Sequence, residues 1–532
     1  MPQLPHLQRQ RDRVDLVVGG RPTLLFAGEL RNSSASTLEF MEPLWARLTA
    51  LQLNTLLLPC SWRQFEPEEG CFDERLLSGL IERARREGLR LAPLWLATWK
   101  NGLSGYAPRW VLGDPVRFPR MSPRALSPFG AATLEADRRA FVRFMETIRR
   151  CDPAGETVIL VQVENEVGLL GDSRDRSAPA EAAFRAPVPR MLTEALATHE
   201  AELDPALRAA WTERGRPHGA PWAETFGAGP LADEAFMAWH LGRFVEAVAA
   251  AGKRVHPLPL FVNAWTVDPA DPRPGVHPSG GPVARMLDVW MAAAPSIDLY
   301  GVDNYRADFA GECAAYARRG NPLFIPEAAG WWGGDTPLSS AAKAFFAFGN
   351  GALGYAPFGV DNALYGEHPL GAAYAVLRQL EPLLLAARGG GRRGFYRQGS
   401  EPEERFALGG YEVTIRYALD AAGNQMFETG LAAQAAFGAY GLIVQEREDV
   451  FVVAGRGFQA DFASGDPERP FVLNLGVEEG GFRDGEWRAT RILNGDEVPE
   501  QGTGGVRLPP GACPVFGEPA IAIQRVTLRR TD

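Results

Sequence analysis

Residues 158–167 read Val-Ile-Leu-Val-Gln-Val-Glu-Asn-Glu-Val, a mostly apolar run that ends in two carboxylates flanking an amide. A short run of this kind is typical of a strand that is buried on both faces. Because polar side chains are costly inside such a strand, we expect Glu164, Asn165 and Glu166 where the strand emerges, at its C-terminal end. In a (β/α)8 barrel that end of the strand belongs to the catalytic face.

Seven further runs of the same character alternate with helix-like segments along the first 385 residues. The chain of 532 residues has room for a barrel of about 250 to 400 residues and an accessory domain. The expected barrel strands are residues 24–30, 55–62, 89–99, 158–167, 258–265, 297–305, 322–327 and 351–358. The sequence therefore predicts an α/β fold, a (β/α)8 TIM barrel over residues 1–385.

Two parts of the predicted barrel interrupt the plain alternation. Residues 14–18 and 21–26 favour a hairpin across Gly19-Gly20, next to the first strand. Residues 168–230 are rich in Ala, Pro and Arg, with helix-like pieces at 188–199 and 205–214. Because so long a connection inside a barrel is usually functional, we interpret this insertion as a lid or a subunit contact.

The pattern changes near residue 386, where helical periodicity gives way to short alternating runs separated by Gly, Asp, Asn and Pro. These runs are residues 411–417, 441–445, 450–454, 471–477, 487–493 and 521–528. Their spacing predicts an all-β sandwich over residues 386–532, with a glycine-rich hinge at 388–394. Such a domain could bind polysaccharide, brace the barrel or form a subunit interface, and we favour bracing.

Composition excludes several classes of partner. The formal net charge of −10 argues against binding to nucleic acids or anionic membranes, which need a basic surface. The first 13 residues lack the apolar core of a secretory signal, so we expect a cytoplasmic protein, or a periplasmic one if a leader had been removed. The five cysteines and seven histidines lack metal-type spacing, so we expect reduced thiols and neither a metal nor a cofactor. A homo-oligomer such as a dimer stays open.

Glu166 and Glu327 each close an apolar strand, the fourth and the seventh of the predicted barrel. A glycosidase needs two carboxyl groups on opposite sides of an oxocarbenium-like transition state, one protonated and one charged. One such glutamate alone would usually be a solvated carboxylate, but a pair in one barrel mouth favours catalysis. Asn165 could bind a sugar 2-hydroxyl, and Tyr305, at the end of strand six, could donate a hydrogen bond to Glu327. Geometry alone does not identify which glutamate is the acid.

Residues 162–168, Gln-Val-Glu-Asn-Glu-Val-Gly, resemble the acid/base signature of family-35 glycoside hydrolases, the β-galactosidases. The resemblance implies that Glu166 is the acid/base, that Asn165 binds the 2-hydroxyl, and that Glu327 is the nucleophile. Further segments resemble a bacterial branch of the family that carries a β-rich C-terminal domain: residues 27–35, 95–102, 233–240, 263–265 and 278–282.

One segment departs from the family-35 pattern. Many members end the third strand in a Cys-Ala-Glu-Trp-like sequence, which supplies a carboxylate to the galactose hydroxyls. Here residues 96–100 read Leu-Ala-Thr-Trp-Lys, which is more similar to the neighbouring family-42 β-galactosidases. The departure bears on galactose specificity more than on the retaining mechanism.

The other predicted substrate contacts are polar or aromatic side chains near strand ends. The apolar faces of pyranose rings stack on indole and phenol rings, although each aromatic residue could equally serve in ordinary packing. The predicted contacts are Glu29, Trp95, Trp99, Lys100, Asn101, Asn263, Trp265, Tyr305 and Trp331.

These features predict a retaining exo-glycoside hydrolase. We expect a β-galactosidase that releases terminal β-D-galactose from oligo- or polysaccharide side chains through a covalent glycosyl-enzyme intermediate, with the two carboxyl groups about 5 to 5.5 Å apart. Two alternatives stay open. The same machinery could act on a β-xyloside or an α-L-arabinopyranoside, or the chain could be a non-catalytic carbohydrate-binding protein.

Overall fold

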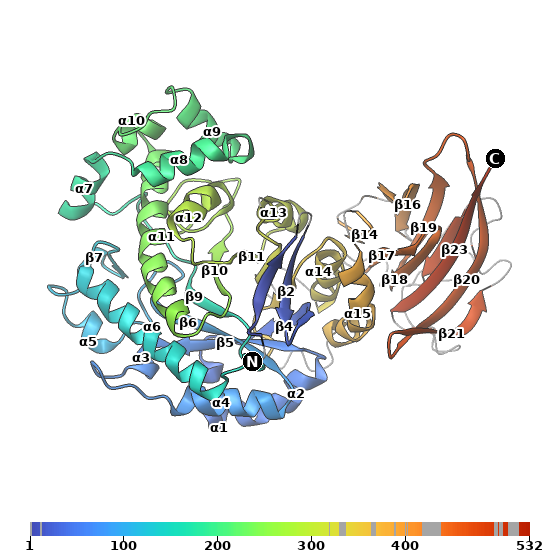
Figure 1. Ribbon diagram of the computed structural model, residues 1–532, viewed down its shortest axis with the longest axis horizontal. Coiled ribbons are helices and arrows are strands. Elements are labelled where there is room, and N and C mark those ends of the chain that lie inside the picture. Colours follow the sequence, from blue (N-terminus) through green and yellow to red (C-terminus); the bar gives the residue numbers. More distant parts are fainter. Residues whose placement is uncertain are drawn as a thin grey trace.

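The computed structural model describes residues 3–10, 13–318, 320–328, 337–362, 369–387, 390–398, 401, 403–417, 438–493, 498, 504–508 and 521–532. Eight parallel strands close into a barrel, in the order in which they follow one another along the chain (Figure 1). They are β4 (Leu25–Glu29), β5 (Thr55–Ser61), β6 (Arg90–Lys100), β9 (Val161–Asn165), β10 (Leu260–Trp265), β11 (Leu299–Asn304), β12 (Phe324–Ala328) and β13 (Gly354–Pro357). The predicted (β/α)8 barrel is confirmed.

Helices of amphipathic sequence surround the strands. In α4 the apolar side chains recur every three or four residues and are buried, namely Leu77, Leu80, Ile81 and Ala84. The barrel helices are α1 (Leu38–Met41), α2 (Trp45–Ala50), α3 (Trp62–Phe65), α4 (Arg75–Arg86), α5 (Arg109–Leu112), α6 (Ala131–Cys151), α11 (Pro230–Val255), α12 (Leu287–Ala293), α13 (Phe309–Tyr316), α14 (Pro337–Gly349) and α15 (Pro369–Ala386).

The N-terminal hairpin closes the end of the barrel at which the strands begin. It consists of β2 (Val14–Val18) and β3 (Arg21–Pro22), with β1 (His6–Arg9) beside β2. Gly19 and Gly20 form its turn at φ +58° and +77°, values that glycine adopts without strain. Leu16 and Val18 belong to the apolar cluster that fills the barrel interior. The hairpin therefore leaves open the other end of the barrel, where the strands have their carboxyl ends.

The insertion after β9 forms four short helices. They are α7 (Ala178–Arg185), α8 (Arg190–Thr198), α9 (Pro205–Thr212) and α10 (Trp222–Phe226). Helix α8 packs against α12, and α10 packs against α11, so the insertion thickens the outer helical layer (Figure 1). The interpretation of this segment as a lid or a subunit contact stays a prediction.

The C-terminal region is a sandwich of two sheets. The six-stranded sheet runs β14 (Arg392–Tyr396), β17 (Tyr440–Arg447), β18 (Val450–Arg456), β23 (Ala522–Thr531), β20 (Phe471–Arg483) and β21 (Glu486–Leu493). The four-stranded sheet runs β15 (Glu403–Leu408), β16 (Tyr411–Tyr417), β19 (Phe458–Ser464) and β22 (Gly504–Leu508). The predicted hinge is wrong in part, because Arg392 to Gly394 form the start of β14. Strand β15 was also missed, because three of its six residues are charged.

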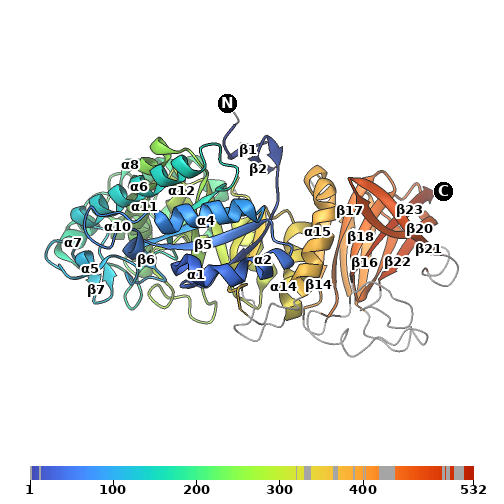
Figure 2. The ribbon, with the colours of Figure 1, turned by 90° about the horizontal axis from the view of Figure 1, so that it is seen from below.

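The six-stranded sheet lies directly on the barrel (Figure 2). Strands β14 and β17 pack against α14, and Tyr440, Leu442 and Val452 belong to the same apolar cluster as the barrel helices. Gly349 of α14 and Gly394 of β14 approach so closely that a Cβ on Gly349 would lie 2.4 Å from the Cα of Gly394. The two regions therefore share one continuous core.

No helix within the described residues is both long enough and apolar enough to cross a bilayer.

Replacing Leu16 by Ala should destabilise the barrel by about 2 to 5 kcal/mol, because the side chain is fully buried in the barrel interior. Urea unfolding followed by tryptophan fluorescence measures the effect, since all 13 tryptophans except Trp487 precede residue 370. Leu475→Ala is the matched control. That leucine is 57% exposed, so its loss should change stability by less than about 0.5 kcal/mol. An equal loss of stability in the two variants would contradict the conclusion that the hairpin closes one end of the barrel.

Candidate active site

Three carboxylates from three strand ends meet at the open end of the barrel. Glu166 follows β9, Asp303 lies near the end of β11, and Glu327 lies near the end of β12. All three residues are buried, and one carboxylate oxygen of each lies within 4.8 Å of an oxygen of the other two. The structure thus brings together the two glutamates that the sequence placed on strands four and seven.

Strand alternation explains much of this convergence. Leu25, Phe261 and Leu299 point into the barrel interior, and every second residue of a strand shares a face. By this rule Glu29 on β4, Asn263 and Trp265 on β10, and Asp303 on β11 face the axis at the open end. Glu327 reaches the same place through an irregularity in the pairing of β12 with β13, between Ile325 and Ala328.

Glu327 is oriented by a neighbouring tyrosine. The Tyr305 hydroxyl donates a hydrogen bond of 2.5 Å to its Oε1 atom. Its Oε2 atom is buried and has no hydrogen-bond partner among the described residues. Burial and the charge of Glu327 raise the pKa of Tyr305 well above its usual value, so the phenol keeps its proton. One carboxylate oxygen is therefore fixed while the other faces the site.

Glu166 is an unusually weak acid for a glutamate, so it keeps its proton to a higher pH than usual. Burial, followed by the charge of Glu327, raises its pKa to about 7, although the Lys100 ammonium opposes the rise. Its backbone N–H donates to Asn263 Oδ1 at 2.9 Å. Near neutral pH a large fraction of Glu166 is thus protonated, as a general acid requires.

The backbone turns sharply through the Glu-Asn-Glu segment. Glu164 and Glu166 adopt φ values of +63° and +44°, in the left-handed region that most residues avoid. Regular alternation would have sent Glu164 and Glu166 to the same side, and the turn separates them. Glu164 accepts hydrogen bonds from the backbone N–H groups of Thr98 and Trp99, at 3.1 and 2.7 Å. Glu164 therefore supports the backbone of β6, as a supporting partner of the site.

Lys100 supplies the positive charge of the site. Burial alone would lower its pKa, but the carboxylates of Glu327, Glu166, Glu29 and Asp303 raise it above the usual value. Its Nζ donates to Asn165 Oδ1 at 2.9 Å. The other polar atom of that amide, Asn165 Nδ2, is buried and has no partner among the described residues. The Lys100 ammonium offsets only one of the surrounding negative charges.

Glu29 faces the same charges from the first strand. Burial, followed by the charge of Glu327, raises its pKa well above the usual value. Its Oε1 atom is buried and makes no hydrogen bond within the described part of the chain. Asn101 follows Lys100 with φ +54°, and its backbone N–H donates to the Asn165 carbonyl oxygen. Both residues were predicted to bind substrate, and both lie at the open end of the barrel.

Two predicted aromatic contacts are corrected by the structure. Trp95 and Trp99 are fully buried on the outer side of β6, so neither ring offers a face to a sugar. Trp95 donates to Asp137 of α6 at 2.9 Å, and Trp99 packs on Phe244 of α11. Their neighbours Leu94 and Leu96 fill the barrel interior, so alternation along β6 could have revealed the outward direction of Trp95.

The remaining predicted substrate contacts differ in their surroundings. Asn263 uses both ends of its amide within the protein, because its Nδ2 donates to Asp303 Oδ2 at 2.6 Å. It positions Glu166 and Asp303 instead of presenting a free group to a sugar. Trp265 is 39% exposed at the end of β10. Trp331 lies outside the described residues.

Asp303 was missed by the sequence prediction. It lies two residues before Tyr305, within the predicted strand six, and alternation from Leu299 places it on the inner face. The alternation that places Asp303 on the inner face can be read from the sequence, but the prediction considered only residues at the strand ends.

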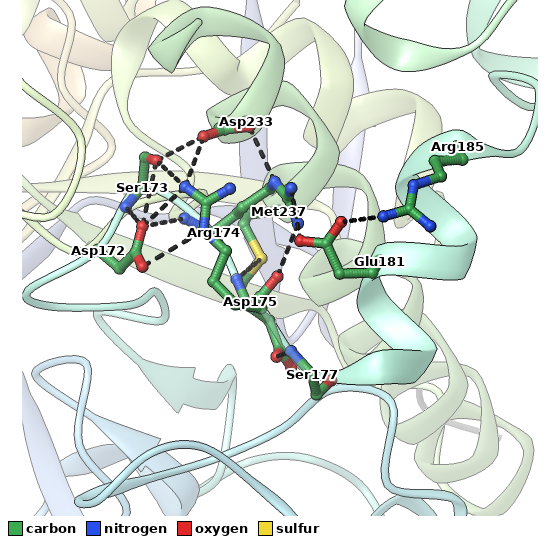
Figure 3. Close-up of polar contacts among 10 residues, drawn as sticks. Asp172, Ser173, Arg174, Asp175, Ser177, Glu181, Arg185, Asp233 and Met237 are labelled. Atoms are coloured by element: carbon green, nitrogen blue, oxygen red, sulfur yellow. Dashed lines mark hydrogen bonds and ion pairs between the residues drawn. The ribbon is translucent and has the colours of Figure 1, made fainter.

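The loop that carries Glu166 is anchored to the start of α11. Leu169 pairs with Ser279 through two backbone hydrogen bonds, and the Ser279 hydroxyl donates to the Ser173 carbonyl oxygen. Arg174 then lies between Asp233 of α11 and Glu181 of α7, at 3.0 and 2.7 Å (Figure 3).

The start of α11 also holds the loop that follows β10. Glu234 of α11 accepts from Arg285 at 2.7 Å and contacts His277 at 2.8 Å. The first turn of α11 thus fixes both loops that flank Glu166, through adjacent carboxylates.

The comparisons with known proteins concern different parts of the chain. Residues 370–502 match the model of a family described as a domain of unknown function (DUF5597). No curated protein matches the sequence.

Several solved structures resemble the chain. A β-galactosidase from Bacillus circulans sp. alkalophilus has 15% identity and a TM-score of 0.47, covering 69% of this chain and 58% of that one. A catalytic mutant of a family-42 β-galactosidase from G. stearothermophilus has 11% identity and a TM-score of 0.49, covering 95% and 98%. A β-1,4-mannanase from Aplysia kurodai has 12% identity and a TM-score of 0.41, covering 70% and 96%. The chain spans less than two thirds of the first of these proteins. At such identities and TM-scores we transfer no activity to the chain.

Replacing Gly168 by Ala should impair the site, because the added Cβ would lie 2.5 Å from the Pro278 backbone at φ +153°. The resulting shift of the Glu166 loop should lower kcat/KM for the glycosidase activity predicted from the sequence by about 10- to 100-fold. Gly171→Ala is the matched control. Its φ of +89° is also unfavourable, but no atom lies within 4 Å of its added Cβ. An equal loss of kcat/KM in both variants would indicate backbone strain as the cause, and no specific effect of the Pro278 contact.

Proposed function

We propose that the protein is a retaining, exo-acting glycoside hydrolase, and specifically a β-galactosidase. The observation that carries the proposal is the pair Glu166 and Glu327, whose nearest described oxygens lie within 4.8 Å across the open end of the barrel. Retaining enzymes hold their two carboxyl groups about 5 to 5.5 Å apart, whereas inverting enzymes leave about 6.5 to 9.5 Å for a water molecule. The short separation favours direct attack by one carboxylate.

The two glutamates take different roles because their surroundings differ. Glu327, oriented by Tyr305, attacks the anomeric carbon while Glu166 donates its proton to the departing glycosidic oxygen. Glu166 then removes a proton from water, and that water releases the sugar from Glu327 with the original configuration. The raised pKa of Glu166 supports the acid role, and the hydrogen bond from Tyr305 supports the charged state of Glu327.

Buried polar atoms without partners support a hydroxyl-rich ligand. Glu29 Oε1, Asn165 Nδ2 and Glu327 Oε2 are buried and make no hydrogen bond with any described residue. Buried polar groups are normally satisfied, and sugar hydroxyls can both donate to the carboxylates and accept from the amide. We propose these atoms, with Lys100 and Asn101, as the contacts of the reacting sugar.

Trp265 is suited to the leaving portion of the substrate. It lies two residues beyond Asn263 on the inner face of β10, and it is partly exposed. Its indole ring could stack on the sugar that follows the scissile bond. The choice of galactose rests on the resemblance of residues 162–168 to family-35 enzymes. A panel of nitrophenyl β-galactoside, β-xyloside and α-L-arabinopyranoside would separate these sugars.

Glu327→Gln should lower kcat/KM for nitrophenyl β-galactoside by more than about a thousandfold, because an amide cannot replace the carboxylate nucleophile. Glu166→Gln should lower it by about 10² to 10⁴, most strongly for poor leaving groups that need a proton. Proton NMR of the first product should show the β-anomer. Glu74→Gln, outside the barrel mouth, controls for general effects of the substitution. An initial α-anomer, or wild-type activity in either variant, would refute the mechanism.

The pH dependence should report the acid. Because Glu166 must be protonated and has a pKa of about 7, kcat/KM should fall above about pH 7, approaching tenfold for each further pH unit. The measurement is a kcat/KM profile between pH 5 and 9, with the Glu166→Gln variant for comparison. The variant should lose this alkaline limb. A limb near the ordinary glutamate value, or one that persists in the variant, would exclude Glu166 as the acid.

A further inference from the structure

Asp303 neither attacks the sugar nor transfers a proton in the two proposed chemical steps, yet its carboxyl lies close to both Glu166 and Glu327. It is buried, and one of its oxygens lies within 4.8 Å of oxygens of both Glu166 and Glu327. Its Oδ2 atom accepts a hydrogen bond of 2.6 Å from Asn263. Its Oδ1 atom is buried and makes no hydrogen bond among the described residues. One edge of this carboxyl is therefore fixed, and the other is available to the catalytic pair.

The buried carboxyl groups around Asp303 cannot all carry a negative charge. Four carboxyl groups face one another here, and Lys100 is the one cation among the described residues whose charge acts on all four. If all four were ionised, the buried group would carry a net charge of −3, which is costly in a low dielectric. Electroneutrality is reached when only one carboxylate, that of the proposed nucleophile Glu327, is ionised in the field of Lys100. The other three then keep their protons, namely Glu29, Glu166 and Asp303.

The remaining neighbours do not alter this balance. Tyr305 from the end of β11 and Tyr316 from α13 are both phenols whose pKa is raised by burial, so they stay neutral. Burial, followed by the charges of Glu327 and Glu166, likewise raises the pKa of Asp303 well above its usual value.

We propose that Asp303 is a positioning residue that stays protonated and whose hydroxyl donates a hydrogen bond to Glu166 when Glu166 becomes a carboxylate. This inference rests on the proposed glycosidase function. Asn263 holds Oδ2 as the acceptor, so the proton of Asp303 belongs on Oδ1, the atom that lacks a partner. Oxygens of the two carboxyl groups lie within 4.8 Å of each other, and a hydrogen bond between the two side chains lowers the pKa of Glu166 and raises that of Asp303.

The hydrogen bond acts in the first chemical step. As the bond between the anomeric carbon and the leaving oxygen breaks, its electron pair takes the proton of Glu166, and Glu327 forms the new bond to carbon. Glu166 is left negative beside Glu327, which has become a neutral ester. Asp303 keeps its own proton and stabilises the new carboxylate of Glu166, which makes Glu166 a better acid. Hydrogen bonds to charged groups are stronger than those between neutral groups.

Two variants of Asp303 separate a protonated residue from an ionised one. Asp303→Asn keeps an acceptor for Asn263 and an N–H donor for Glu166, so the alkaline limb of kcat/KM should stay within about 0.3 pH units of the wild type. Asp303→Leu removes the donor, so the carboxylate of Glu166 is less stable and the limb should move upward by about one pH unit. The Leu variant should also lose activity on poor leaving groups by about tenfold more than on dinitrophenyl glycosides.

The opposite sign would overturn the proposal. If Asp303 were ionised, Asp303→Asn would remove a negative charge and move the limb downward. If the Leu variant does not fold, the direction of the shift in the Asn variant still decides. Asp288→Asn, a buried aspartate on α12 that pairs with Arg318, should leave the limb unchanged.

A measurement without substrate distinguishes this inference from the proposed function. Carbon-13 NMR of labelled glutamate carboxyls, with Glu166 assigned by the signal lost in Glu166→Gln, gives the pKa of Glu166 directly. A wild type that hydrolyses no glycoside would refute the proposed function alone. The pKa of Glu166 should still be unchanged in Asp303→Asn and raised in Asp303→Leu, and a lowered value in the Asn variant would refute the role of Asp303.

Discussion

The site depends on the balance of buried charge around Lys100. One ammonium acts on four buried carboxyl groups, so their protonation states cannot be set independently. A carboxylate that pairs with the lysine forces its neighbours to keep their protons. Under the proposed mechanism, this constraint would give two chemically identical side chains separate roles, because a charged Glu327 favours a protonated Glu166.

The second requirement is a backbone that holds Glu166 in an unfavourable conformation. Positive φ values at Glu164 and Glu166 cost conformational energy unless the surroundings fix them. The hydrogen bonds from Thr98 and Trp99 to Glu164 fix one side of the turn, and the pairing of Leu169 with Ser279 fixes the other. Strain of this kind is common where a side chain must be aimed without freedom to relax.

Much of the barrel followed from the sequence because its strands are continuous apolar runs with polar ends. Glu166 and Glu327 were found from that pattern alone. The prediction failed for Trp95 and Trp99 because it considered only their nearness to the strand end. Counting alternate residues from Leu94 and Leu96 would have shown that Trp95 points outward. No local preference in the sequence indicates the left-handed turn at Glu164. Asp303 could have been found by counting alternate residues from Leu299, but its meaning depends on charges brought from three other strands.

The shared core of the barrel and the sandwich bears on how such a protein can evolve. The match to the domain of unknown function begins at residue 370, inside the last barrel helix α15, and not at the first strand of the sandwich. Gly349 and Gly394 meet without space for a side chain, and residues of β17 and β18 complete the apolar layer over α14 and α15. Neither half presents a finished surface at the junction. Such a sandwich is inherited with its barrel as one unit, and exchanging it for an unrelated carbohydrate-binding module would require a new surface on both partners.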